Sequence, residues 1–119
     1  SGNSVTPAFL FAVFLWSAFN KRLSQISKKS KSRIELMLEA SEYVIKQQTQ
    51  QVMMPKWLSS RVKDVWLMQY HLENYNPKKS KTLIRSPRFR MAYDFLLLRS
   101  ESIDKELKLK ADYWTNIQK

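Results

Sequence analysis

Glycine is almost absent from this sequence, since Gly2 is the only one among 119 residues. Tight turns, barrels and phosphate-cradling loops depend on glycine because it adopts backbone conformations that other residues reach only at a steric cost. Phosphate-binding motifs such as GxxxxGK[ST] and GxGxxG are therefore excluded. Helices need glycine only where they end. This shortage, together with abundant Leu, Lys, Ser and Gln, predicts an all-α chain.

Cysteine is absent, which excludes disulfides and thiolate metal sites and fits a cytoplasmic location. The single histidine, His71, falls in the middle of a predicted helix and is interpreted as a structural or surface residue. Asp64 and Asp94 could be imagined as a metal-binding pair. However, Asp94 lies four residues after Arg90 and is expected to pair with it, and Asp64 lies on a basic helix. We therefore predict no catalytic residue and no metal ligand in this chain.

Hydrophobic runs long enough to cross a membrane are also lacking. The apolar run Ala8–Phe19 has twelve residues, whereas a bilayer needs about 20. It lacks the flanking features of a signal peptide, and the longer stretch Ala8–Arg22 lacks the polar face of a membrane-surface helix. We predict a buried helix with no membrane span. Because the run is apolar on every side, part of it is expected to meet another domain.

Capping and proline signals divide the first half of the chain. Ser1–Asn3 is interpreted as a cloning scar, and residues 4–119 as a single helical domain. Thr6-Pro7 is a cap followed by a proline, typical of a helix start. Ser32 and Glu35 form a capping-box pattern, which predicts a second helix to about Gln50.

Similar signals in the second half complete a predicted compact bundle of five or six helices. Pro55 begins a helix that ends near residues 74–76 and has an apolar face containing Leu58, Val62, Val65, Trp66, Gln69 and Leu72. A short helix is expected over residues 77–84. Ser86-Pro87 predicts the start of the next helix, to about Ser100. Ser102 is expected to cap the last helix, with Leu107, Ala111, Trp114 and Ile117 facing inward.

Positive charge is concentrated in two short stretches. The formal net charge is +11, from 21 basic and 10 acidic residues. Residues 21–33 and 77–90 each carry six basic residues and no acid, so the rest of the chain has nine basic and ten acidic residues. A surface whose charges only promote solubility would intersperse basic and acidic residues. Two such blocks instead predict that a polyanion binds here.

The stronger candidate is the 78–90 cluster, which comprises Lys78, Lys79, Lys81, Arg85, Arg88 and Arg90. Spacings of three, four and three residues would place four of these on one helical stripe, although Pro87 is expected to break the helix. Arg88 is expected in the first turn of the next helix, where the helix dipole and unpaired N–H groups favour phosphate. The forked donors of arginine match phosphate oxygens. We predict contacts to a phosphate backbone, the alternative being a solvated basic face.

The second candidate is the 28–33 cluster, which comprises Lys28, Lys29, Lys31 and Arg33. It lies in a predicted Ser/Lys linker. One interpretation is that these cations attract a polyanion at long range, and the alternative is that the linker is only a soluble loop. Two aromatic residues near helix ends, Trp57 and Tyr75, are candidates for stacking on bases.

Several blocks of the chain resemble one known family. They are Thr6–Ala12, Pro55-Lys56 with Leu58, Asp64-Val65-Trp66, and the most specific stretch, Arg88-Phe89-Arg90-Met91-Ala92-Tyr93-Asp94 with its continuation to Arg99. In this order, over nearly the whole chain, they resemble the C-terminal region of bacterial poly(A) polymerases.

The resemblance implies a division of labour. In such enzymes a catalytic head holds paired aspartates and Mg²⁺, a neck recognises ATP, and a helical body holds RNA. This chain would be the body, with head and neck upstream and no cofactor of its own, acting as a cytoplasmic monomer in the polyadenylation that promotes RNA decay. The resemblance thus implies a non-catalytic RNA-binding domain, with the 78–90 cluster and then the 28–33 cluster as its contacts.

Two other functions remain open from the sequence. The chain could be a structural scaffold that docks on the catalytic head through its apolar first helix without touching RNA. It could also be a DNA-binding helix-turn-helix protein, but the helix after Pro87 has no basic residue between Arg90 and Arg99, so a base-reading face is poorly supplied.

Overall fold

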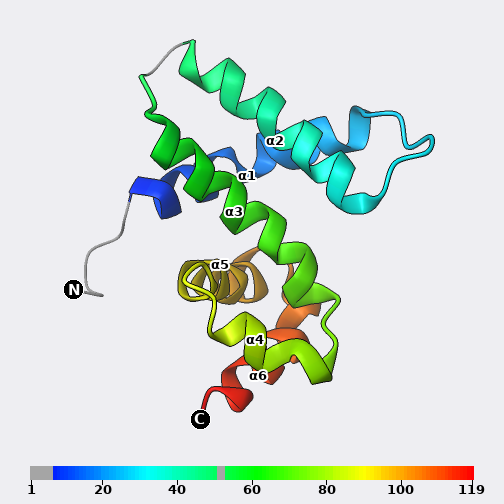
Figure 1. Ribbon diagram of the computed structural model, residues 1–119, viewed down its shortest axis with the longest axis vertical. Coiled ribbons are helices and arrows are strands. Elements are labelled where there is room, and N and C mark those ends of the chain that lie inside the picture. The colour runs from blue at the N-terminus through cyan, green and yellow to red at the C-terminus, as the bar shows by residue number, and fades with distance from the viewer. Residues whose placement is uncertain (1–6, 51–52) are drawn as a thin grey trace. The chain divides into compact units, whose positions relative to one another are not determined.

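The computed structural model describes residues 7–50 and 53–119, and every regular element in these ranges is helical (Figure 1). The six α-helices are α1 (Pro7–Gln25), α2 (Arg33–Thr49), α3 (Lys56–Glu73), α4 (Ser80–Ile84), α5 (Phe89–Ser102) and α6 (Lys108–Ile117). Two short 3-10 helices, η1 (Pro77–Lys79) and η2 (Lys105–Leu107), precede α4 and α6. The all-α prediction is confirmed. The interpretations of Ser1–Asn3 and Thr6 lie outside the described residues.

The chain divides into two compact units, the first ending at Leu67 and the second running from Met68 to Lys119. The boundary falls within α3, so this helix contributes residues to both units. Each unit has its own buried residues. That residues 4–119 form a single domain stays a prediction.

In the first unit, α1 packs against α2, and small and aromatic residues make up most of its buried face. Ala8, Ala12, Trp16, Phe19 and Leu23 recur every three or four residues along α1 and are buried. The indole of Trp66 from α3 stacks on Phe19 with ring centroids 4.7 Å apart, and its Nε1 donates a hydrogen bond to the Ala12 carbonyl at 3.1 Å. These two contacts hold α1 against α3.

The opposite face of α1 is apolar but is not buried within the part of the chain that the structure describes. Phe14 is 75% exposed and Leu10 is 44% exposed. A helix packed against two neighbours buries one broad stripe and leaves the rest of its circumference outside. That the exposed part of α1 meets another domain stays a prediction.

The predicted capping box begins α2. Ser32 Oγ accepts a hydrogen bond from the Glu35 backbone N–H at 3.2 Å, and Glu35 Oε1 accepts one from the Ser32 N–H at 2.8 Å. The bond from the Ser32 backbone, followed by the Ser32 side chain and the nearby charge of Lys31, lowers the pKa of the Glu35 carboxyl below its ordinary value. The box satisfies two N–H groups that a helix start otherwise leaves unpaired.

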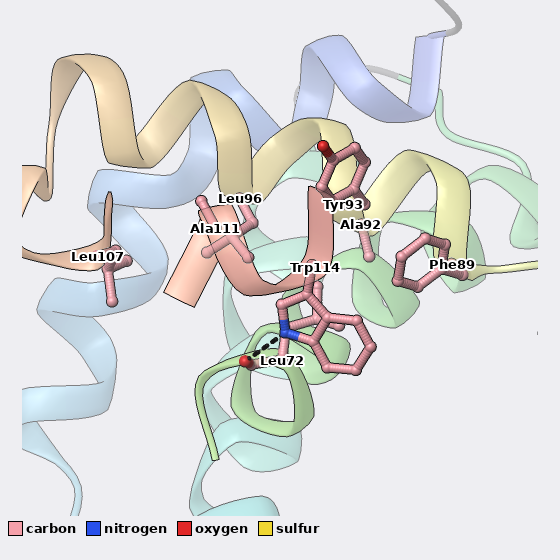
Figure 2. Close-up of a cluster of buried hydrophobic side chains, with 8 residues drawn as sticks. All are labelled: Leu72, Phe89, Ala92, Tyr93, Leu96, Leu107, Ala111 and Trp114. Atoms are coloured by element: carbon pink, nitrogen blue, oxygen red, sulfur yellow. Dashed lines mark hydrogen bonds between the residues drawn. The ribbon is translucent and has the colours of Figure 1, made fainter. Parts of the chain in front are cut away.

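The second unit is built around an aromatic and aliphatic core (Figure 2). Its buried members are Leu72, Phe89, Ala92, Tyr93, Leu96, Leu107, Ala111 and Trp114. The Trp114 indole donates a hydrogen bond to the Leu72 carbonyl at 2.8 Å, so the largest core side chain also satisfies its polar atom (Figure 2). The six residues predicted to face inward along α3 are all buried, which confirms its helical period.

Two helix starts in this unit differ from the predictions. Helix α5 begins at Phe89, and the Ser86 hydroxyl accepts a hydrogen bond from the Arg88 N–H at 3.1 Å in the turn before it. Ser102 lies inside α5 rather than capping the last helix, because the Ile103 N–H still bonds the Arg99 carbonyl. Ile117 is 36% exposed rather than buried, since α6 ends there.

Candidate nucleic-acid interface

The 78–90 cluster begins on a capped turn. The Asn76 side chain accepts a hydrogen bond from the Lys78 N–H at 3.0 Å, and Pro77 opens η1. Asparagine before proline favours such a turn because the side chain replaces a missing backbone partner. The side chains of Lys78 and Lys79 therefore project from a defined 3-10 turn and not from an irregular loop.

Ser80 ties this basic segment to the core of the second unit. It is 2% exposed, and its hydroxyl lies 2.7 Å from the Tyr113 hydroxyl of α6. Further along α4, Leu83 and Ile84 pack against the buried core cluster. Because the inward positions of this short helix are serine, leucine and isoleucine, its one lysine, Lys81, must lie on the other side.

Four cations of the cluster consequently face solvent. Lys78, Lys79, Lys81 and Arg85 are exposed, and none of them pairs with a carboxylate within residues 7–50 and 53–119. Arg85 Nε donates a weak 3.3 Å hydrogen bond to the Lys81 carbonyl. Helix α4 ends at Ile84, so the continuous helical stripe of cations expected from the spacing is interrupted, as Pro87 indicated. The cations lie instead on η1, on α4 and in the turn that follows α4.

Arg88 and Arg90 are placed differently from these four. Arg88 is half-buried and is the residue that precedes α5, one position outside the helical turn predicted for it. Arg90 pairs with Asp94 at 3.4 Å, as predicted, and also donates to Gln118 Oε1 at 2.8 Å. These contacts make Arg90 less available to a phosphate than the four exposed cations.

Residues 21–119 match the family described as "Polymerase A arginine-rich C-terminus". This chain belongs to that family. It is 29% identical over 116 residues to Poly(A) polymerase I of Escherichia coli O6:H1 and 28% identical to the protein of the same name in Salmonella typhi. The corresponding protein of Haemophilus influenzae is 23% identical over 115 residues.

Each of these matches covers 96% of this chain but 25% of the relative. The chain therefore spans about a quarter of the length of the curated relatives it matches. The resemblance to the C-terminal region of bacterial poly(A) polymerases is confirmed.

The stretch that most clearly carries the family resemblance is largely internal. Phe89, Ala92, Tyr93, Phe95 and Leu96 are all buried, as helical spacing along α5 requires. The Tyr93 hydroxyl lies within hydrogen-bonding distance of Thr115 Oγ1 on α6. The family stretch therefore encodes the packing of α5 against its neighbours more than a binding surface.

Arg99, at the end of this stretch, is a buried structural cation that the sequence did not single out. It is 5% exposed. Its Nη1 donates to Glu73 Oε2 at 2.7 Å and to Gln69 Oε1 at 2.8 Å, and its Nε donates to Asp104 Oδ2 at 3.0 Å. Two of these partners lie 26 and 30 residues away along the chain, so no local pattern predicts them.

The 28–33 cluster lies in the first unit, between α1 and α2. Lys28 and Lys29 are exposed in the connecting loop, where Ser30 adopts a left-handed conformation with φ of 58°. Lys31 forms an ion pair with Glu39 at 2.5 Å, and Arg33 is the first residue of α2. One of the four cations is thus already neutralised by a carboxylate from α2.

The two predicted stacking residues have different surroundings. Trp57, at the start of α3, is 57% exposed and remains accessible. Tyr75 is half-buried, with its ring 3.9 Å from that of Tyr113 and edge-on to Trp114 at 5.5 Å. The aromatic contacts of Tyr75 therefore belong to the core of the second unit.

The residues weighed for catalysis are surface or paired residues. His71 is exposed on α3, edge-on to the Tyr70 ring. Throughout residues 7–50 and 53–119, no group of three or more His, Cys, Asp or Glu side chains could hold a metal ion. Across the same ranges, no helix has both the length and the apolar character to span a bilayer.

Proposed function

We propose that this chain is the RNA-holding, non-catalytic part of a poly(A) polymerase. In the proposal, the 78–90 cluster grips the phosphate backbone of an RNA strand whose 3′ hydroxyl receives AMP from ATP. The transfer itself, with ATP and Mg²⁺, is assigned to a catalytic region of the same longer cytoplasmic protein. Family membership supports the assignment to a poly(A) polymerase. The four exposed cations around α4, which pair with no carboxylate of the described residues, support binding to the phosphate backbone.

The exposed cations carry the proposal because phosphate contacts are independent of sequence. A strand held by its backbone keeps its register and orientation without any base being read. An enzyme that extends many different RNA 3′ ends needs this kind of contact. Ser80, Leu83 and Ile84 fix the backbone from which the lysines extend, so less conformational freedom is lost on binding.

The test is RNA binding by the 119-residue chain across about 50 to 200 mM salt. A variant with Lys78, Lys79, Lys81 and Arg85 changed to Gln should lower the salt slope by about 4 and the affinity on the order of 100-fold or more. The matched control changes Lys105, Lys108, Lys110 and Lys119 to Gln, which removes the same charge from the same unit.

Oligo(A) and a single-stranded DNA of equal length serve as ligands, and both should bind. Equal losses in the two variants would show that only net charge matters and would refute a grip at α4. Binding that is insensitive to salt would equally contradict phosphate contact.

A structural scaffold is the second candidate, favoured by the exposed apolar face of α1. Phe14 and Leu10 lie four residues apart, and such a pair is suited to docking on another protein surface. If this were the whole function, the chain would bind no RNA even at about 50 mM salt, and a Phe14→Ser variant would weaken its association with the catalytic region.

A further inference from the structure

A groove with a volume of about 360 Å³ lies between α1 and α2 in the first unit. Alanine and aliphatic side chains form its apolar part, and Lys21, Arg22, Tyr43, Gln47 and Gln48 are among its polar lining residues. No carboxylate lines it. Its volume falls within the range of small-molecule sites, about 300 to 1,000 Å³, and accommodates a single nucleotide.

The groove contains a preformed stack. The Arg22 guanidinium carbon lies 3.8 Å from the centroid of the Tyr43 ring. Tyr43 nevertheless remains 43% exposed, so part of its ring is still accessible from the groove. Bases of single-stranded RNA stack on tyrosine rings and on arginine guanidinium planes, and a base that enters here would extend the existing pair.

Arg22 is held by this ring and not by an acid. Among the described residues it forms no ion pair, and its Nε is buried without a hydrogen-bond acceptor. Buried donors in folded proteins are nearly always satisfied by protein groups or by ordered water, so this N–H is open to an acceptor such as a water molecule or a ligand atom. A guanidinium without an acid also keeps its full charge for a phosphate.

Glutamine amides surround the stack. Gln25, Gln47 and Gln48 line the groove, and within residues 7–50 and 53–119 none of their side chains forms a hydrogen bond. An amide offers one acceptor and two donors, and glutamine can pair in bidentate fashion with adenine N6 and N7. This set of groups suits a purine better than an aliphatic or purely anionic ligand.

We infer that this groove binds one base of a single-stranded RNA, with adenine preferred: the base stacks on the Arg22–Tyr43 pair, the glutamines contact its edge, and Lys21 attracts the adjoining phosphate. The inference rests on the proposed function and adds base contact to it. The 78–90 cluster, in the second unit, grips phosphates regardless of sequence, whereas this groove distinguishes a strand with bases from one without them.

The experiment compares the affinity of the 119-residue chain for oligo(A), oligo(U) and an abasic ribose-phosphate strand of the same length. The wild-type chain should bind oligo(A) best. Tyr43→Leu should reduce the preference for oligo(A) over the abasic strand by about tenfold, because that is the order of one lost stacking contact. Tyr43→Phe keeps the ring and should retain the preference.

A second pair of variants tests the edge contacts and guards against misfolding of Tyr43→Leu. Gln47→Leu should reduce the preference for oligo(A) over oligo(U) by about fivefold or more, the low end of what one bidentate contact contributes. Gln50→Leu makes the same chemical change outside the groove lining and should alter nothing. Oligo(A) should also shift the backbone amide resonances of residues 43–48 in an isotope-labelled chain.

The failures are distinguishable. If Tyr43→Leu and Gln47→Leu fold and leave every affinity ratio unchanged, the groove inference is overturned, while salt-dependent binding lost in the α4 variant keeps the proposed function. If no strand binds at about 50 mM salt, both fail. If oligo(A) is preferred but shifts resonances only outside α1 and α2, base contact exists elsewhere and this site is refuted.

Discussion

The 78–90 cluster and the 28–33 cluster both concentrate cations in a short stretch without acids, but the fold holds them by different means. The first is fixed by tertiary contacts, since Ser80 bonds Tyr113 of α6 and Leu83 and Ile84 reach the core. The second depends on the local capping box of Ser32, and Lys31 is taken up by Glu39.

The difference teaches that charge content alone does not rank two basic stretches as binding sites. Cations on a fixed backbone lose only side-chain freedom when they bind a phosphate, whereas cations on a loop also lose backbone freedom. The 78–90 cluster is therefore expected to dominate affinity.

The largest expected effect comes from the buried network of the second unit. Arg99→Met should lower the free energy of unfolding by about 3 kcal/mol, because it strips the partner from Glu73 and Asp104. Their side chains are 28% and 29% exposed, so water partly compensates them and the loss falls at the lower end of the range for broken buried pairs. Urea unfolding followed by circular dichroism measures it.

The control for this prediction is Arg90→Met, which removes an exposed pair on the same helix and should cost less than about 1 kcal/mol. Equal losses in the two variants would mean that the buried network adds nothing to the stability of the unit that holds the 78–90 cluster.

An intermediate effect is expected from the tertiary anchor. Ser80→Ala should destabilise the chain by about 1 to 2 kcal/mol, because it leaves the Tyr113 hydroxyl without this partner. Affinity for oligo(A) should fall about two- to tenfold without a change in salt slope, since every cation is still present but less well positioned. Thr82→Ala, an exposed hydroxyl on the same helix, is the control, and matching results would remove the role assigned to Ser80.

The smallest effect is expected from the local anchor. Ser32→Ala should cost about 1 kcal/mol of stability through loss of the cap and should leave RNA affinity almost unchanged. A large loss of affinity would show that the 28–33 cluster is as important as the 78–90 cluster.

The pH dependence of this cap follows from Glu35. Since its pKa is lowered in the folded chain, the charged carboxylate stabilises the fold above its unfolded-state pKa, and this contribution is lost as pH falls through the folded-state value. Unfolding of wild type and Glu35→Gln should therefore differ most near neutral pH and converge in acid. A difference that grows in acid would reverse the sign of this linkage.

Helix positions were predictable because their signals are local. The capping box at Ser32, the proline before α3 and the spacing from Leu58 to Leu72 all act within a few residues of one another. Starts that depend on weaker signals were misplaced, as at Ser86 and Ser102, where neighbouring turns decide whether the helix continues.

The composition and spacing of the sequence by themselves determined an all-helical chain, its buried α3 face and the two concentrations of positive charge. Tertiary structure alone decided that Arg99 is an internal cation, that Lys31 is paired, that Phe14 is exposed and that Arg22 stacks on Tyr43. The physical reason is distance along the chain. Helical periodicity and capping arise between near neighbours. In contrast, Arg99 meets Gln69 and Glu73 of another helix, Arg22 meets Tyr43 of another helix, and Lys31 in a loop meets Glu39 of α2, and only packing brings these side chains together.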